Sequence, residues 1–369
     1  MTAPAIPIYQ GQEFYVPAFE VKLKGQPVGR DVIRDIISVS YKDNLLEIDS
    51  FEITINNWDA ETRGFKYSDD RLFDPGGKIE LSMGYRNDMR LMLTGEITSL
   101  RPSFPASGGG TLAVSGLNQL HRFRTSQVSD TYLNKTDSEI AEIIGTRLTG
   151  VVVKGAHLNT EPRIPYLLQD NQYDIVFLME RARRVGYELV VVEPQNGGKT
   201  IINFAPSTNV RRLSYRLTYG KSLIEFQPEL TTANQVSKVT VRGWDATKKE
   251  KIEKTVTRAE LATKGVGSDG GQEAIDQQIE QKEEVVTDRP VQTPEEAAKL
   301  AKEILEGIAK DMVKGTGSVP GLPDIRAGTV LLIDGLGKRF SGRYFVMGTT
   351  HTIGDSGYTT QFECRREEV

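Results

Sequence analysis

The feature that most constrains the fold of this chain is an internal repeat of glycine-bounded strands. Near each end, a strand bounded by glycines is followed by two further glycines that lie 15 residues apart. The two copies are residues 77–84 with Gly95 and Gly110, and residues 328–335 with Gly342 and Gly357. Agreement in order, glycine placement and hairpin length favours a duplicated unit over the chance recurrence of hairpins. We therefore expect two similar antiparallel β-barrel domains, one at each end.

Most of the 35 glycines punctuate short segments in which apolar and polar residues alternate. Within 78–84, for example, Ile79, Leu81 and Met83 share one face, which is the period of a strand with one buried side. The fold class predicted is β-rich α+β. Strands are expected at 51–56, 78–84, 90–94, 96–100, 111–115, 188–192, 200–204, 216–219, 223–226 and 238–244.

The middle of the chain has helical signals. Thr136 and Glu139 form a capping box before an apolar stripe, which predicts a helix to about Gly150. A second helix is expected over 174–185, with Gly186 placed to end it. Together with the hairpin at 188–204, these helices predict a small inserted α/β domain.

After Trp244 the sequence becomes polar and glycine-rich up to about Asp288, with no apolar period that would build a core. We expect a polar, partly flexible excursion there. Thr293 begins an amphipathic helix that Gly315 is expected to end. The predicted domains are 1–120 (first tube-like β-barrel), 121–210 (α/β insert), 211–245 with 320–369 (second tube-like β-barrel), and 246–319 (excursion and helix).

Charge and composition argue against several functional classes. The 46 basic and 50 acidic residues leave a net charge of −4, so a basic footprint for nucleic acid is missing. The single cysteine cannot form a disulfide within the chain. No apolar run approaches the roughly 18 residues that span a bilayer, and the first residues lack the features of a signal peptide. We expect no nucleic-acid partner, no direct membrane insertion and assembly in the cytoplasm.

A search for catalytic groups finds few candidates. His121, His157 and His351 are the three histidines, and none has a serine, cysteine or paired carboxylate at a recognisable spacing. Residues 265–270 match GxGxxG but do not follow a strand, so a loop is the better interpretation. The sequence predicts no catalytic, cofactor-binding or metal-binding residues, no cofactor, and a protein that is not an enzyme.

The remaining candidate groups favour structural roles. Gly108 to Gly110 suit a hairpin tip, and the aspartates near residue 70 suit a solvated turn. A buried position is expected for the cysteine, core or interface positions for the tryptophans, and a solvated helix face or a protein interface for the arginines of the second helix. These residues are Asp69, Asp70, Asp74, Cys364, Trp58, Trp244, Arg181, Arg183 and Arg184.

Several ordered segments resemble the phage late control protein D family, the tail hub family shared by contractile phage tails, type VI secretion spikes (the VgrG proteins) and extracellular contractile injection systems. No single segment is diagnostic, but together they cover most of residues 35–369 apart from the excursion. The segments are 93–104, 111–116, 169–174, 177–180, 217–223, 239–245 and 335–351.

The resemblance implies a homotrimeric baseplate hub in which each chain carries two barrels related to the inner tube protein. Three chains with two similar barrels each would present six quasi-equivalent faces to a sixfold tube and three repeats to a threefold spike. The implied partners are the inner tube protein, a spike protein and other baseplate proteins. Because the sequence stops at residue 369, soon after the last expected strand, we expect the spike to be a separate polypeptide.

Two other functional classes stay open at the level of sequence. One is a tail-associated enzyme that degrades cell wall with carboxylates that the sequence does not locate. The other is a β-rich binding module that acts alone. The parent machine could equally be a phage, a bacteriocin-like particle or a cellular injection system.

Overall fold

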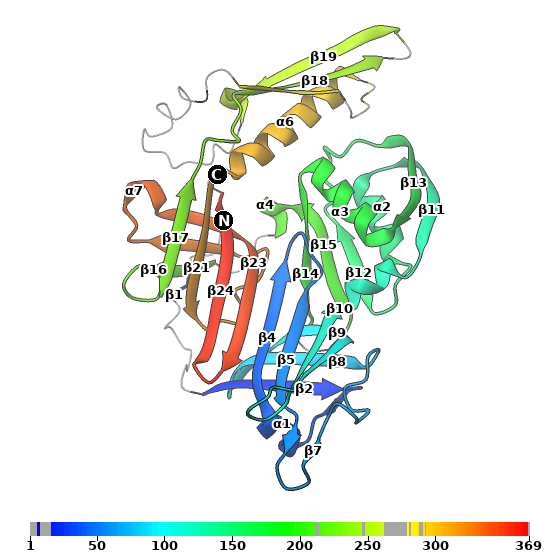
Figure 1. Cartoon of the computed structure of the whole chain (residues 1–369). Coiled ribbons are helices and arrows are strands. Elements are labelled where there is room, and N and C mark those ends of the chain that lie inside the picture. Colours follow the sequence, from blue (N-terminus) through cyan, green and yellow to red (C-terminus); the bar gives the residue numbers. More distant parts are fainter. Residues whose placement is uncertain are drawn as a thin grey trace.

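The computed structural model of the chain is β-rich, with two β units side by side, a small α/β unit and a helix-backed hairpin at one end (Figure 1). It confirms the predicted fold class. The structure describes residues 6–7, 16–195, 197–210, 214–245, 248–261, 279, 282–287, 291 and 293–367.

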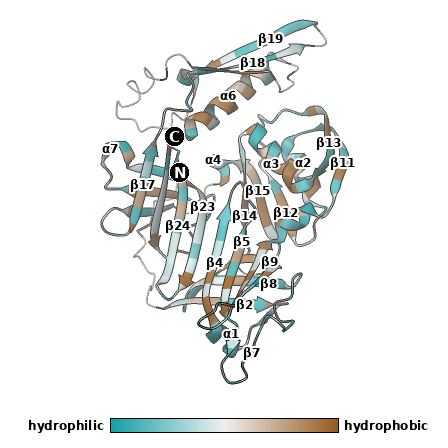
Figure 2. Cartoon of the chain, in the orientation of Figure 1, coloured by the Kyte–Doolittle hydropathy of each residue, from teal (hydrophilic) through white to brown (hydrophobic). Residues whose placement is uncertain are grey.

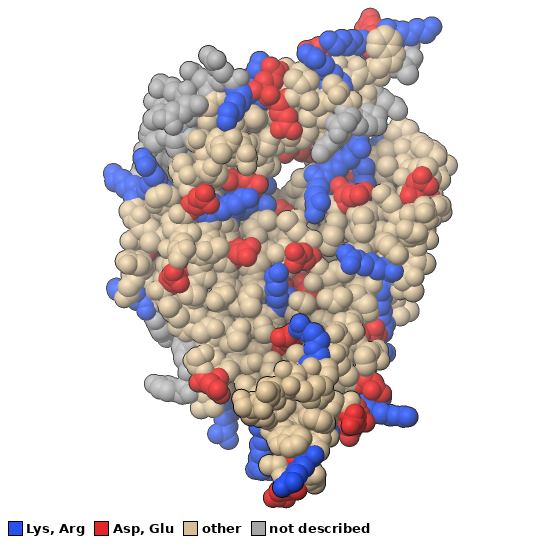
Figure 3. Space-filling view, viewed as in Figure 1, with Lys and Arg blue, Asp and Glu red and all other residues tan. Residues whose placement is uncertain are grey.

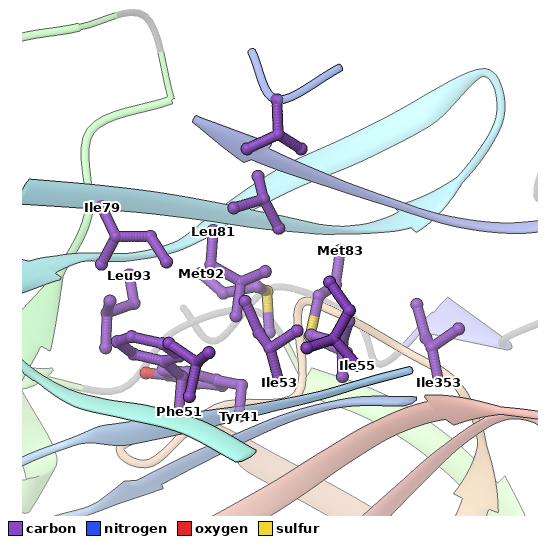
Figure 4. Close-up of a cluster of buried hydrophobic side chains, with 14 of the residues drawn as sticks. Tyr41, Phe51, Ile53, Ile55, Ile79, Leu81, Met83, Met92, Leu93 and Ile353 are labelled. Carbon is purple, nitrogen blue, oxygen red and sulfur yellow. The ribbon is translucent and has the colours of Figure 1, made fainter. Parts of the chain in front are cut away.

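The first β unit has a core formed where its strands fold over one another. Side chains of β4 and β5, such as Tyr41, Ile53 and Ile55, point toward Leu81 of β8 and Leu93 of β9 (Figure 4), and all five are buried. Its main strands are β2 (Pro17–Leu23), β4 (Ile36–Asn44), β5 (Ser50–Asn56), β8 (Lys78–Tyr85), β9 (Asp88–Ser103) and β10 (Thr111–Asn118). Shorter elements are β3 (Gln26–Pro27), α1 (Arg30–Asp35), β6 (Trp58–Asp59) and β7 (Gly64–Phe65).

The second β unit is assembled from segments that are far apart in the sequence. Its core contains Tyr215, Leu331, Tyr344 and Phe362, all buried. Its main strands are β16 (Ser214–Thr218), β17 (Glu225–Leu230), β21 (Val313–Pro320), β22 (Val330–Asp334), β23 (Gly342–Gly354) and β24 (Gly357–Arg366). The short strand β1 (Ile6–Pro7) pairs with β16, and α7 (Gly337–Phe340) lies between β22 and β23.

The two β units share one strand order. If the main strands of each unit are numbered along the chain, both sheets read 1-4-5-6-3-2: β2-β8-β9-β10-β5-β4 and β16-β22-β23-β24-β21-β17. They differ in one direction, because β2 runs antiparallel to β8 whereas β16 runs parallel to β22. The terminal units therefore have the same arrangement except for the sense of their first strand.

Backbone contacts fix which residues of the two units correspond. Ile97 bonds to Gly76 and Gly77 through its carbonyl and N–H, and Val346 bonds in the same way to Gly328 and Thr329. Gly328 therefore corresponds to Gly76, and both have a φ of +87°.

This correspondence corrects the glycine echo. The echo paired Gly328 with Gly77 and, through the equal 15-residue spacing, Gly357 with Gly110, and this second pair would place buried Val114 opposite exposed Gln361. The structure instead aligns Val114 with buried Phe362, because β9 and β23 each carry one β-bulge in their pairing with the following strand. The echo identified the right elements, but its register is one residue off at Gly77 and Gly110 and two residues off at Gly95.

The α/β unit contains β12 (Val151–Gly155), β14 (Tyr187–Val192) and β15 (Thr200–Pro206) in one small sheet, with α2 (Asp137–Gly145) and α3 (Asp174–Val185) beside it. Thr136 makes the predicted capping box with Glu139, and Gly186 ends α3 with a φ of +68°. The helix α2 ends at Gly145, five residues before the predicted end. Other elements are the 3-10 helix η1 (Gln119–Arg124), the paired strands β11 (Gln127–Lys135) and β13 (Ile164–Tyr173), and α4 (Ser207–Val210).

The segment expected to form a polar excursion has a core among its described residues. Val241 of β18, Ile252 of β19, Val286 of β20 and Leu300 of α6 are all buried together. Here β18 (Lys238–Asp245) pairs with β19 (Glu250–Thr257) and β20 (Glu283–Val286), and α6 (Pro294–Lys310) covers this sheet, with the 3-10 helix η2 (Arg258–Glu260) beside it. Two expectations thus fail: this region builds a core, and β18 joins it instead of the second β unit.

The other boundaries differ in detail. One strand, β9, replaces the two expected at 90–94 and 96–100. The helix α6 ends at Lys310, and Gly315 lies inside β21 opposite Pro228. Apart from the place of β18, the domain boundaries proposed from the sequence stay a prediction. Within the part of the chain that the structure describes, no helix combines the length and apolar character needed to cross a bilayer.

Candidate functional site: the seam and open edges of the β units

The two β units are joined by backbone pairing between β4 and β23, which we call the seam. Residues 39–44 pair antiparallel with residues 348–353, next to the stretch of β23 that pairs with β22. Leu45 N–H donates to the Met347 carbonyl at 3.0 Å and continues this ladder. The seam therefore makes one uninterrupted run of eight described strands: β9, β10, β5, β4, β23, β24, β21 and β17.

The outer face of this run is polar. Figure 2 shows hydrophilic and hydrophobic residues mixed along β4, β23 and β24, as strands with one buried face require. Around the seam this face forms a shallow groove of about 270 Å³ whose lining includes Lys42, Glu225, Gln227, Thr350 and Glu363. Figure 3 shows basic and acidic side chains interspersed over the same view, without a large region of one sign.

Beneath the seam lies a buried ion pair. Arg326 Nε donates to Asp43 Oδ2 at 2.6 Å, and the same guanidinium donates to the Met92 carbonyl at 3.0 Å and to the Tyr41 hydroxyl. Asp43 also accepts from the Thr349 N–H at 3.0 Å. These contacts tie the second unit to β4 and β9 of the first, so the seam is fixed by side chains as well as by backbone.

Burial and charge shift the pKa values of this cluster. Burial and the neighbouring Asp43 carboxylate raise the pKa of Asp49 to about 7. Burial opposes the charge of Arg326, but Tyr41 and Asp43 hold its pKa above the usual value. Burial also raises the pKa of the Tyr41 hydroxyl. The cluster is therefore a structural network in which arginine stays charged.

His351 is buried beside the cluster and is neutral. Its Nε2 is 2.9 Å from the Ile325 carbonyl, which only accepts, so Nε2 carries the proton. Its Nδ1 then accepts from the hydroxyls of Tyr358 and Thr360, each at 3.0 Å. Burial lowers the pKa of His351 to about 4. All these hydrogen bonds are to residues on the side of the second β unit, so the His351 side chain fixes that side of the seam and does not face solvent.

Sequence reasoning missed Asp43 and Arg326. One signal for Asp43 was available: it follows Val39 and Tyr41 at a spacing of two, so a carboxylate occupies a core-facing position of an alternating strand. Arg326 lies in a loop and has no such local signal, because its partners come from residues more than 200 positions away.

Both ends of the eight-strand run have an open backbone edge. On β9, the pairing with β8 stops at Glu96, and no described strand pairs with residues 99–103 on the side away from β10; we call this the β9 edge. On β17, no described strand pairs with Glu225–Leu230 on the side away from β21; we call this the β17 edge. Unpaired strand edges invite pairing with another chain.

The other histidines make surface contacts with carboxylates. His121 Nε2 lies 3.0 Å from Glu96, which Arg122 also contacts, and His157 Nε2 lies 2.8 Å from Glu142. The hydrogen bonds of the two imidazoles among the described residues involve no serine or cysteine, and His157 meets the Ser138 hydroxyl oxygen only through its backbone N–H, at 3.1 Å. Neither histidine belongs to the strands that form the seam.

One arginine of the second helix was assigned to the wrong environment. Arg181 is buried, and its Nε donates to Asp137 of α2 at 2.6 Å, so it links α3 to α2 inside the α/β unit. Arg183 is exposed and Arg184 is half-buried. The apolar stripe of α3 alone could not show that Arg181, which lies beside the stripe, pairs with a buried carboxylate of another helix.

The remaining candidates fall in structural positions. Cys364 is buried, and burial raises the pKa of its thiol. Trp58 is half-buried and packs against Phe65, whereas Trp244 is exposed, so a core position is wrong for Trp244 and an interface position stays a prediction. Gly108 lies at the hairpin tip with a φ of +90°.

Residues 265–270 lie outside the described residues, and Asp69, Asp70 and Asp74 form turns. Across the described ranges, no cluster of three or more histidine, cysteine or acidic residues is arranged to hold a metal.

Comparisons with known proteins place this architecture. A family model described as the Alg8 N-terminal domain matches residues 15–355. The chain belongs to this family. The narrower assignment to the late control protein D family stays a prediction. No curated protein matches this chain.

Several solved structures share the fold of this chain. It is similar to the 43 kDa tail protein of prophage MuSo2 from Shewanella oneidensis, with a TM-score of 0.69, 15% identity and coverage of 95% of this chain and 100% of that one. A tail protein of Neisseria meningitidis is similar with a TM-score of 0.66 and 15% identity, over 95% of this chain and 97% of that one. A type VI secretion component of E. coli is similar with a TM-score of 0.58 and 12% identity, over 93% of this chain and 76% of that one. The fold is that of tail proteins.

Proposed function

We propose that this chain is a structural hub of a phage tail or contractile injection baseplate, acting as a homotrimer that joins a sixfold inner tube to a threefold spike. The observation that carries the proposal is the shared strand order of the two β units, which lie side by side in one sheet. A trimer of such chains offers six similar β units around its axis while repeating its other parts three times.

The likeness to tail proteins and to a type VI secretion component supports this role through the fold. The buried network supports it as well, because a hub has to transmit load between its β units without shearing. The role needs no catalysis, and we propose none. The inner tube protein, a spike protein and other baseplate proteins are the proposed partners, with assembly in the cytoplasm.

The test has two parts. Native mass spectrometry of the purified chain should give a species of about 123 kDa, three times the 41.0 kDa of one chain. A reconstruction of particles from a strain that carries the gene should place this density between tube and spike. A chain that stays monomeric at all concentrations and is missing from purified particles would contradict the proposal.

A parallel assay addresses the enzymatic alternative. The purified chain is incubated with cell-wall material, and released fragments are measured. We expect no release above that from heat-treated protein. Turnover that disappears when a carboxylate pair is neutralised would replace the hub by a tail-associated enzyme.

A further inference from the structure

The seam shows how one β unit of this chain binds another, and the two open edges repeat its two halves. The seam pairs strand 2 of the first unit, β4, with strand 5 of the second unit, β23. By the shared strand order, strand 2 of the second unit is β17 and strand 5 of the first unit is β9. These two strands carry the open edges.

We propose that the β9 edge of one chain pairs with the β17 edge of a second copy, in the antiparallel register of the seam. The inference rests on the proposed trimeric hub and names its interface. Such an interface is heterologous, because different surfaces of the two copies meet, and it generates a ring when its rotation closes.

The register follows from the internal correspondence. The bulges align Thr350 with Arg101 and Thr349 with Leu100, and the β4–β5 and β17–β21 pairings align Lys42 with Glu229. Transferring the seam pairs then predicts three pairs between copies: Leu100 with Leu230, Arg101 with Glu229, and Pro102 with Pro228.

The predicted pairs are chemically complementary. Leu100 and Leu230 are both half-buried at the rims of their cores, so pairing removes two apolar side chains from water. Arg101 and Glu229 are exposed and of opposite charge. Within its own chain Arg101 contacts Glu52, so it would lie between two carboxylates in the pair of copies.

Backbone polarity also fits. The Asn118 N–H donates to the Asp49 carbonyl, so every second residue of β10 counted from Asn118 bonds to β5 and the residues between them bond to β9. On β9 the residues bonded to β10 therefore alternate with Leu100 and Pro102, whose backbone groups point to the open β9 edge. The Thr231 N–H donates to the Met312 carbonyl, so every second residue of β17 counted from Thr231 bonds to β21. The backbone groups of Leu230 and Pro228 therefore point to the open β17 edge. The residues that face outward are therefore the ones that meet in this register, where Leu100 and Leu230 can exchange two N–H···O bonds and the two prolines can exchange none.

The prolines select this register over its neighbours. Proline lacks an N–H, so each open edge has one defective position. In the predicted register Pro102 and Pro228 fall opposite each other, so both missing N–H donors are confined to one residue pair. A shift by two residues would spoil two rungs and would also separate Arg101 from Glu229.

Cysteine cross-linking tests the register. Arg101 and Glu229 form a non-hydrogen-bonded pair in the proposal, where Cα atoms lie about 4.5 Å apart and a disulfide fits. A chain with Arg101→Cys is mixed with a chain with Glu229→Cys and oxidised. We expect a covalent dimer in the mixture and none from either variant alone. The native Cys364 is buried and stays reduced.

The matched control is the corresponding rung of the seam. The double variant Lys42→Cys/Thr350→Cys should form an intrachain disulfide in any oligomeric state, because these two residues are paired within one chain. If the control closes and a species of about 123 kDa forms, but the mixture gives no dimer, the edge pairing is wrong and the hub proposal stands. A chain that remains monomeric overturns both.

Charge reversal gives a second readout that does not need oxidation. Arg101→Glu should raise the dissociation constant of the oligomer about two- to five-fold, as expected for an exposed ion pair, and adding Glu229→Arg should restore it. Equal weakening by the single and double variants would show that these residues do not face each other.

Discussion

At the scale of residues, the seam depends on a charge that is almost enclosed, because the Arg326 side chain is only 12% exposed. Arg326 satisfies Asp43, the Met92 carbonyl and the Tyr41 hydroxyl, and its guanidinium carbon lies 4.5 Å from the centre of the Tyr41 ring. Removing one member of such a pair leaves the other charge without compensation, which costs much more than losing an exposed pair.

Arg326→Met should therefore lower the free energy of unfolding by about 3–5 kcal/mol. The matched control is Arg216→Met, because Arg216 pairs with Asp334 at 2.6 Å but is 55% exposed. The control should cost about 1 kcal/mol or less. Urea denaturation of both variants measures the difference. Similar losses in the two variants would show that the buried pair contributes no more than a surface contact.

We expect the titration of His351 and that of Asp49 to change the stability of the folded chain in opposite directions as pH falls. His351 has a folded pKa of about 4, below its usual 6.5, so the unfolded chain binds more protons between these values and stability falls as pH falls through them. Asp49 has a folded pKa of about 7, above its usual 3.8, so the folded chain binds more protons and stability rises as pH falls.

Each response appears when the other group is removed. Relative to the wild type, Asp49→Asn should lose stability as pH falls from 6.5 to 4, by about 3 kcal/mol at most, and His351→Gln should gain it. Thermal denaturation at several pH values measures both slopes. Parallel curves for the wild type and both variants would contradict the assignment.

At the scale of elements, local signals were enough where caps define the structure. Thr136 and Gly186 set the start of α2 and the end of α3 as predicted. The end of α6 was missed because Met312, which extends its apolar stripe, instead enters the core of the second β unit. Likewise β18 was expected correctly as a strand, but which sheet it joins depends on β19 and α6.

The candidate site also divides into parts that the sequence could predict and parts that it could not. The sequence indicated two related β units and few catalytic groups, which follow from strand alternation and residue types. It could not give the seam or the open edges, because these are defined by pairing between residues about 300 positions apart. Arg181 failed for a related reason: its charge is buried only because Asp137 faces it from another helix.

The bulge of β9 makes a prediction at this scale. A Cβ on Gly116 would lie 2.1 Å from the Glu96 carbonyl oxygen and 2.4 Å from the Phe51 ring, so neither neighbour leaves room. Gly116→Ala should destabilise the chain by about 1–3 kcal/mol through overpacking. Gly109→Ala, in the same hairpin, would meet Trp58 at 3.4 Å and should be close to neutral. Equal melting temperatures would contradict this prediction.

At the scale of the whole molecule, the seam and the proposed contact between copies differ in one respect. The position of Asp43 corresponds to Leu230, and that of Arg326 to Asp74, so the buried ion pair of the seam has no counterpart between copies. The contact within a chain is thus locked by charge, whereas the contact between chains relies on backbone and apolar pairing. We expect the ring to dissociate into folded chains.

A heterologous contact also predicts how two damaged chains combine. Leu100→Lys places a charge on the β9 edge, and Leu230→Lys does so on the β17 edge, so each variant alone should be monomeric. A mixture retains one sound edge of each kind and should form only a dimer of about 82 kDa, twice 41.0 kDa. Mass photometry measures the species, and circular dichroism confirms that each variant is folded. Trimers in the mixture, or dimers of one variant alone, would require a different contact.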